Sequence, residues 1–171
     1  MARAAATSRP PSTNWAAYAA SGWAFAFGGL SLYWGLGGTA LAGTVSPDAE
    51  AMVEERIAWF IALLWAVAVL KLGIGALALA LVRPWGRSVP RWMLLLAAWG
   101  AGAAMVLYGA VQLSLSVPVL TGAVSAPEAP EPSVLRWHVF LWQPYWLMGG
   151  ILLLIAACTY RRHSRALSSH P

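Results

Sequence analysis

Four long apolar stretches dominate the sequence, and each is long enough to cross a lipid bilayer. They cover residues 15–38, 57–82, 92–120 and 137–160. A helix needs about 20 residues to span ~30 Å of hydrocarbon, and backbone groups in lipid must be hydrogen-bonded within their own segment. The sequence also lacks the alternating pattern of a membrane β-barrel. We therefore predict an all-α fold, a four-transmembrane-helix bundle that forms one domain over residues 14–162, with polar tails at 1–13 and 163–171.

Composition agrees with a membrane protein and narrows its partners. Hydrophobic residues make up 60% of the chain and charged residues only 10%, whereas a soluble domain is about half apolar and a quarter charged. The net charge of +5 comes from short arginine clusters and not from a basic stripe interleaved with aromatic residues. Nucleic acid is therefore a poor partner, and an anionic membrane surface is a better one. Cys158 is the only cysteine, which excludes an intrachain disulfide and a CxxC pair.

The charges between the stretches predict the orientation of the chain. Eight arginines would fall on one side of the membrane: Arg3, Arg9, Arg83, Arg87, Arg91, Arg161, Arg162 and Arg165. The other side would receive Arg56 and Arg136 together with all six acidic residues: Asp48, Glu50, Glu54, Glu55, Glu128 and Glu131. Arginine-rich segments stay in the cytoplasm. We therefore expect a multi-pass membrane protein with both termini cytoplasmic.

The first stretch has a second interpretation as a cleaved signal peptide. Arg3 and Arg9 would precede its apolar region, and residues 40–42 offer a cleavage site made of small residues. The apolar region of a signal peptide has about 7–15 residues, and this one is longer and contains Trp23 and Trp34. An uncleaved helix is therefore the favoured interpretation.

Small residues at four-residue spacing predict how the helices associate. Lipid tails are as apolar as leucine, so membrane helices pack through small residues and a few hydrogen bonds. Such residues lie in the first, third and fourth stretches: Ala20, Ala24, Gly28, Ala98, Gly102, Ala101, Gly109, Gly149 and Gly150. We expect them to form packing surfaces within one bundle, and the alternative is the interface of a homodimer. Pro144 should kink the fourth helix and loosen its outer third, because it removes the hydrogen bond to the Phe140 carbonyl.

Lys71 is the most unusual residue, because it lies near the middle of the second stretch. A lysine at the bilayer midplane costs at least ~2.5–3.5 kcal/mol and should face the bundle interior or a hydrated cavity. No acidic residue lies within the four stretches to pair with it. The lysine must therefore be neutral, solvated, held by carbonyls, hydroxyls and aromatic faces, or matched by an anionic ligand. The alternative without function is a lysine that reaches a lipid phosphate or a water pocket.

Aromatic and polar residues gather at the predicted outer ends of the stretches. The candidate ligand-binding residues, with Lys71, are Tyr33, Trp34, Tyr108, Gln112, His138, Trp142, Gln143 and Tyr145. His138, Trp142 and Tyr145 follow the i, i+4, i+7 spacing of one helix face. A pocket of this composition between bundle helices is a common ligand site. The alternative is an interfacial aromatic belt with satisfied hydrogen bonds.

Enzyme chemistry has little support in the sequence. There is no HExxH motif, no G-x-S-x-G elbow and no P-loop, and His138 is the only histidine away from the tail. We expect no metal and no cofactor. The absence of acidic residues within the stretches also argues against carboxylate-driven proton coupling.

Three segments resemble an uncharacterised family of actinobacterial four-pass membrane proteins, domain of unknown function 3995. They are residues 32–38 (LYWGLGG), residues 81–92 (LVRPWGRSVPRW) and residues 141–150 (LWQPYWLMGG). The resemblance implies a membrane location and no particular activity. The family pattern has histidine where this chain has Ser31 and glutamate where it has Gln143. The resemblance thus implies that an ionisable pair is missing here, which puts any activity that depends on the pair in doubt.

Three classes of function follow from these features. The first is a non-enzymatic protein that binds a lipid, a small apolar ligand or a membrane-protein partner. The second is a transporter or channel subunit in which Lys71 lines a hydrated path. The third, least favoured because no second catalytic group is evident, is a membrane enzyme with His138 as its acid or base.

Overall fold

The computed structural model describes residues 14–127 and 129–168, and helices make up most of this part of the chain. The four long helices are α1 (Trp15–Gly35), α4 (Ala58–Ala80), α5 (Arg91–Leu120) and α7 (Gln143–Ser168). Shorter elements connect them: α2 (Ala42–Val45), α3 (Pro47–Glu54), η1 (Pro84–Ser88), α6 (Pro132–Trp137) and η2 (His138–Trp142). Among the described residues there is no strand, so the all-α prediction is confirmed. The predicted tail at 1–13 lies outside the described residues.

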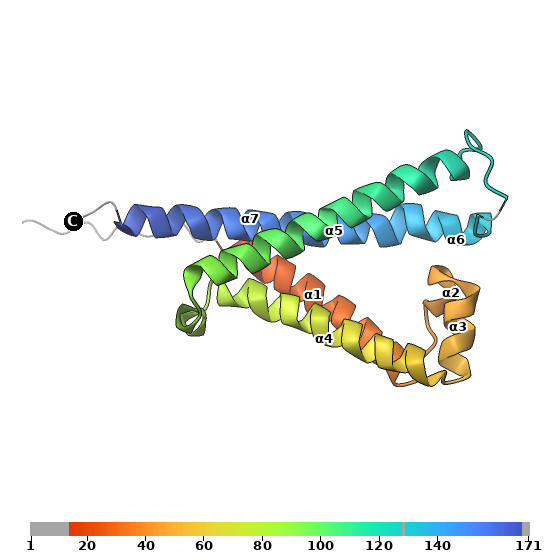
Figure 1. Cartoon of the computed structure of the whole chain (residues 1–171), viewed down its shortest axis with the longest axis horizontal. Helices are drawn as coiled ribbons and strands as arrows, with labels where there is room; N and C mark the ends of the chain where they lie inside the picture. The colour runs from red at the N-terminus through yellow and green to blue at the C-terminus, as the bar shows by residue number, and fades with distance from the viewer. Residues whose placement is uncertain (1–13, 128, 169–171) are drawn as a thin grey trace, which may run out of the picture.

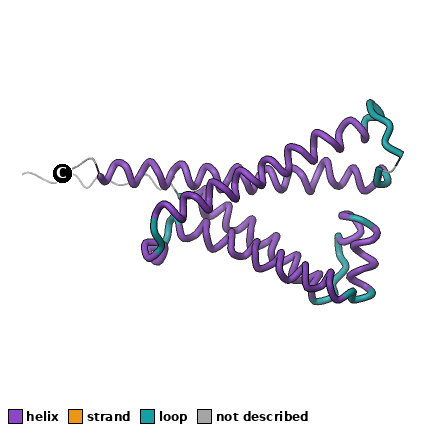
Figure 2. Tube along the Cα trace, in the orientation of Figure 1, coloured by secondary structure: helices purple, strands orange, loops and turns teal. Residues whose placement is uncertain are grey.

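The long helices form two pairs, α1 with α4 and α5 with α7. Figure 1 shows that the pairs meet near η1 and diverge toward α2, α3 and α6. We call these the converging end and the diverging end. Contact between the pairs runs chiefly through α1 and α7, whereas α4 and α5 touch sparsely. The diverging end is occupied by short helices and the loops between them (Figure 2).

Small side chains fill the converging end and allow the helices to approach closely. The buried residues there are Ala16, Ala17, Ala20, Ala78, Ala80, Leu81, Leu94, Ala98, Leu153, Ala156 and Ala157. The Arg91 guanidinium donates a hydrogen bond to the Arg161 carbonyl at 3.3 Å, which brings the start of α5 beside the last turns of α7. The arginines of residues 83–91 and 161–162 thus share this end, opposite the acidic residues of α3.

Glycines let α5 and α7 pack backbone to backbone along a line that we call the glycine seam, made of Gly102, Gly109 and Gly150. A Cβ atom on Gly150 would lie 2.8 Å from the Gly102 carbonyl oxygen and 2.9 Å from the Val106 nitrogen. A Cβ atom on Gly109 would lie 3.1 Å from the Gln143 carbonyl oxygen. These positions therefore form a packing surface within one chain, which is the first of the two predicted roles.

Three helical segments are long and apolar enough to cross a membrane: Ala58–Ala80, Arg91–Leu120 and Pro132–Arg162. Helix α1 has 21 residues, or ~31 Å at 1.5 Å per residue, but is not among them. Its sequence mixes alanine with tryptophan, tyrosine, glycine and serine, and about half of it is buried against the other helices. Length and composition thus support three of the four predicted spans, and α1 does not meet the same criterion.

The predicted limits of the segments differ from the observed ones mainly at the diverging end. Helix α1 ends at Gly35, three residues early, because the chain turns at Gly37 with φ of +101°. The connector between α1 and α4 contains two short helices, α2 and α3, and the connector between α5 and α7 contains α6. Helix α7 continues to Ser168, beyond the predicted limit at residue 160 and into the segment predicted as a tail.

Candidate functional site

A cavity of about 170 Å³ lies at the diverging end, between the two helix pairs. Its walls combine aromatic rings with three polar or charged side chains. The lining residues are Phe27, Trp34, Val45, Lys71, Tyr108, His138, Trp142, Gln143 and Trp146. They come from α1, α2, α4, α5, η2 and α7, so the site exists only when both pairs are assembled. We call it the Lys71 cavity.

Lys71 is 5% exposed although it is an ionisable residue within one of the candidate membrane helices. Its ammonium nitrogen donates a hydrogen bond to the Ser31 hydroxyl at 2.9 Å. It also lies 3.3 Å from the ring centre of Phe27 and 5.9 Å from that of Trp146. Aromatic faces attract cations by ~2 kcal/mol or more in a desolvated site. Of the predicted options for Lys71, the hydroxyl and the aromatic face are therefore the observed ones.

His138 and Gln143, at the junction of η2 and α7, form a hydrogen-bonded pair in the cavity wall. The Nε2 atom of His138 lies 2.8 Å from the Val45 carbonyl oxygen. A carbonyl only accepts, so Nε2 carries the hydrogen, and Nδ1 accepts from the Gln143 amide nitrogen at 3.0 Å. Gln143 is 2% exposed, and its side-chain oxygen, Oε1, has no hydrogen-bond partner among the described residues. Gln143, a residue of the cavity wall, thus carries a buried acceptor that the described part of the chain leaves unpaired.

A π-helical turn, η2, brings this pair together. The Gln143 amide donates to the His138 carbonyl, five residues earlier, and the next residue is Pro144, which has no N–H to donate to the Phe140 carbonyl. A π turn commonly marks a functional site. Because five residues complete the wide turn, the side chain of Gln143 returns to the helix face that carries His138, one turn further along. A kink was predicted at Pro144. The structure has the π turn at this point instead, and Figure 1 shows α6, η2 and α7 as one continuous rod.

The same turn separates Tyr145 from His138, contrary to the i, i+4, i+7 spacing. The Tyr145 hydroxyl donates to the Trp23 carbonyl at 3.2 Å, and the Trp23 indole N–H donates to the Tyr145 carbonyl at 2.9 Å. Tyr145 therefore joins α7 to α1, and it lines a second cavity of about 160 Å³. Phe27 and Trp142 line both cavities and stack at 6.1 Å, so their rings form the wall between them.

Indole groups fix the connector between α1 and α4 over the site. Trp34 donates to the Ala40 carbonyl at 2.8 Å, and Trp142 donates to the Thr44 carbonyl at 3.3 Å. With the bond from His138 to Val45, two carbonyls at the end of α2 are paired by side chains of the other helix pair. Such terminal carbonyls have no partner within their own helix, so these bonds hold α2 in place.

The structure brings together six of the nine residues that we predicted for the site. Those lining the cavity are Lys71, Trp34, Tyr108, His138, Trp142 and Gln143. Tyr33 is 45% exposed, and neither it nor Gln112 lines the cavity. Phe27 and Trp146 also line the cavity, and neither was predicted from the sequence. Phe27 lies four residues before Ser31, so a helix places both on one face. This spacing could have indicated Phe27, but Ser31 was not among the predicted site residues.

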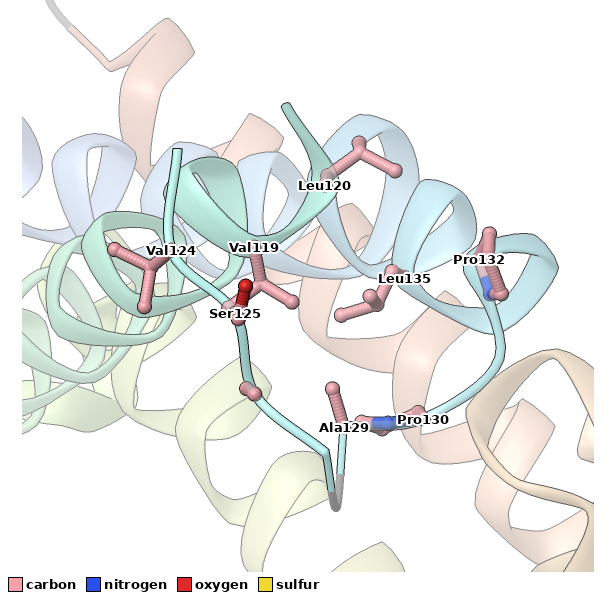
Figure 3. Close-up of a pocket in the computed structure, with 9 residues that line it drawn as sticks. Val119, Leu120, Val124, Ser125, Ala129, Pro130, Pro132 and Leu135 are labelled. Atoms are coloured by element: carbon pink, nitrogen blue, oxygen red, sulfur yellow. The ribbon is translucent and has the colours of Figure 1, made fainter. Parts of the chain in front are cut away.

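A larger cavity of about 340 Å³ lies between the end of α5, the following loop and α6. Figure 3 shows that its lining is mostly Val, Leu, Ala and Pro side chains, with Ser125 as the one hydroxyl. No charged or amide side chain of the described residues lines it to orient a ligand. The described residues also contain no group of three potential metal ligands. The Lys71 cavity is therefore the better candidate site.

Comparison with known proteins gives a family but no activity. Neither the curated proteins nor the solved structures gave a match. Residues 24–153 match a family described as "Protein of unknown function (DUF3995)". This range contains every residue that lines the Lys71 cavity. Since the match covers well over half of the sequence, the chain belongs to the DUF3995 family.

Proposed function

We propose that this protein is a membrane-embedded binding protein for a small amphipathic molecule. The apolar part of the ligand would lie against the aromatic walls of the Lys71 cavity, and an oxygen of its polar part would accept a hydrogen bond from Lys71. In this proposal α1 is the fourth span. The arginine-rich converging end faces the cytoplasm of a bacterium, and the cavity lies in the outer half of the plasma membrane.

The observation that carries the proposal is the environment of the Lys71 ammonium group. The group has three N–H donors, and the structure pairs one of them with Ser31 and sets the charge against Phe27. A charge buried without a carboxylate is costly, so it is kept in a membrane segment mainly where it serves a function. Here it lines a cavity large enough for a ligand, which supports a role in binding.

The sparse contact between α4 and α5 supports access from the bilayer. Lys71 on α4 and Tyr108 on α5 both line the cavity, and Tyr108 is 50% exposed. An amphipathic molecule could therefore enter sideways from the lipid between these helices. Ligand sites in helical bundles lie between helices in this way.

The packing of the converging end favours binding over transport. Ala98, Leu153 and Ala157 are each 0% exposed there, and they lie in the cluster that joins α1, α4, α5 and α7. A hydrated path past Lys71 would have to cross this cluster. Among the described residues, the lining of the cavity reaches Lys71 near the middle of α4 and includes no member of this cluster.

Native mass spectrometry of the protein in mild detergent tests the proposal. We expect wild type to retain a bound small molecule and Lys71→Met to lose it. Leu70→Met is the matched control, because Leu70 is 65% exposed on the same helix and should retain the molecule. Ser31→Ala removes one partner of Lys71 without removing the charge, and it should weaken retention.

Two results would overturn the proposed function. One is bare wild-type protein in every mild detergent and in lipid nanodiscs. The other is equal retention by wild type and by a folded Lys71→Met variant. Thermal unfolding of each variant shows whether it is folded, and Ser31→Ala provides the comparison if Lys71→Met does not fold.

A further inference from the structure

We infer that the polar group recognised in the Lys71 cavity is a phenolic hydroxyl, that is, a hydroxyl on a single aromatic ring. This inference rests on the proposed function and specifies its ligand. Two features of the cavity carry it. One is the unpaired Gln143 acceptor, which requires a hydrogen on the ligand. The other is the size and aromatic lining of the space, which suit one ring.

The Gln143 amide is oriented by its neighbour. His138 donates through Nε2 to Val45, so its Nδ1 accepts from Gln143 Nε2. The amide oxygen Oε1 is then left as a buried acceptor with no partner in the described chain. Leaving such a group unpaired costs about 1–3 kcal/mol, and a ligand that donates a hydrogen to it recovers much of that cost.

Lys71 and Gln143 line the same cavity with opposite hydrogen-bonding character. The ammonium group only donates, and the amide oxygen only accepts. A hydroxyl group satisfies both, because its oxygen accepts from Lys71 while its hydrogen is donated to Gln143. An ether or a ketone oxygen satisfies Lys71 alone and would place a second acceptor near Gln143. A carboxylate would do the same and add negative charge near the amide oxygen.

The space and its walls favour a flat ring as the body of the ligand. An engineered apolar cavity of about 150 Å³ holds one benzene molecule, and the Lys71 cavity measures about 170 Å³. Phe27, Trp34 and Trp142 supply aromatic surfaces along it. Aromatic pairs gain about 0.5–1.5 kcal/mol beyond the area they bury, so a ring is bound better than an alkyl group of equal volume.

A phenolic hydroxyl has two sources, a free small molecule and the head group of a lipid that carries a hydrocarbon chain. The two differ in the apolar part outside the cavity. If the head group of a lipid is the natural ligand, an attached chain should strengthen binding by burial between α4 and α5. If a free phenol is the ligand, the chain should add only nonspecific partition into detergent or lipid.

The test compares 4-decylphenol with 4-decylanisole, in which a methyl group replaces the hydroxyl hydrogen, and adds 4-methylphenol as the arm without a long chain. Binding is measured by calorimetry with the full-length protein in nanodiscs, and empty nanodiscs supply the partition background. We expect wild type to bind 4-decylphenol at least about tenfold more tightly than 4-decylanisole, the ratio given by one buried hydrogen bond.

The variant Gln143→Leu removes the acceptor and should reduce the ratio between phenol and anisole to about one. Gln112→Leu makes the same change at a half-buried glutamine outside the cavity and should leave the ratio unchanged. A purely structural role for Gln143 would lower the melting temperature without altering this ratio, so the ratio separates recognition from folding.

Two outcomes distinguish this inference from the proposed function. If Lys71→Met weakens the binding of both probes but wild type binds phenol and anisole equally, the inference is wrong and the binding function stands. If neither probe binds above the nanodisc background, or if both bind equally well to Lys71→Met, the proposed function fails together with the inference.

Discussion

The glycine seam between α5 and α7 and the Lys71 cavity between the two helix pairs are built on opposite principles. At the seam the helices touch through backbone atoms, and a Cβ on Gly150 would lie within 3 Å of the neighbouring helix. At the cavity, large rings and three polar or charged side chains line a space of about 170 Å³. One region leaves no room for an added atom, and the other leaves a polar atom of Gln143 without a partner.

This difference indicates that the glycine seam chiefly supports stability and the Lys71 cavity chiefly supports function. Van der Waals packing holds membrane helices together when small residues let them approach, so a change of size at the seam should affect folding first. Residues that serve function often leave local interactions incomplete. Changes at the cavity should therefore alter binding more than folding. The following substitutions test that contrast, from the largest expected effect to the smallest.

Gly150→Leu should break the seam. The added side chain would meet the Gly102 carbonyl and the Val106 backbone nitrogen, which cannot move aside as a flexible side chain can. We expect a loss of more than ~3 kcal/mol, at the upper end of the cost of overpacking, and little folded protein by size-exclusion chromatography. Gly100→Leu on α5 is the control, since a Cβ there has nothing within 4 Å. Equal yields of the two variants would contradict the close packing that we describe.

Tyr145→Phe should have a small effect, because it removes one hydrogen bond between the helix pairs and keeps the ring. Tyr145 donates to the Trp23 carbonyl and lines the second cavity, not the Lys71 cavity. We expect a loss of about 0.5–1 kcal/mol in the free energy of unfolding, measured by unfolding in SDS, with no change in binding at Lys71. Tyr33→Phe, at a tyrosine that is 45% exposed, should cost less. A larger loss from Tyr33→Phe than from Tyr145→Phe would contradict the stabilising hydrogen bond that we describe for Tyr145.

The sequence alone predicted most of the architecture, because bilayer thickness leaves few options for long apolar stretches. Residues such as Gly102 and Gly150 were expected at helix contacts for their size, and they are found there. Helix α1 was harder to place. Its apolar character is diluted by residues such as Trp23 and Ser21, and these are buried against other helices. A helix buried by protein and a helix exposed to lipid are both rich in apolar residues, so the sequence of α1 alone does not separate the two cases.

The site could be predicted only in part, because two features that build it, the π turn and the hydrogen bond from Lys71 to Ser31, leave no periodic pattern in the sequence. Lys71 stood out by its charge, and the need for aromatic or hydroxyl partners followed from the absence of acidic residues in the stretches. The π turn before Pro144 was not foreseen. It changes the spacing from four residues to five, which pairs His138 with Gln143 and moves Tyr145 to another face. The hydrogen bond from Lys71 to Ser31 spans 40 residues, and no local pattern predicts it.

Lys71 is the only lysine in the chain, so its ammonium group can be observed directly. Protein in which only the lysine side chain carries ¹⁵N should give one Nζ resonance by NMR in nanodiscs. We predict that 4-decylphenol shifts this resonance at saturation and that 4-decylanisole shifts it less. The Gln112→Leu variant should behave as wild type. An Nζ resonance that neither probe moves would contradict the claim that Lys71 binds a ligand in this cavity.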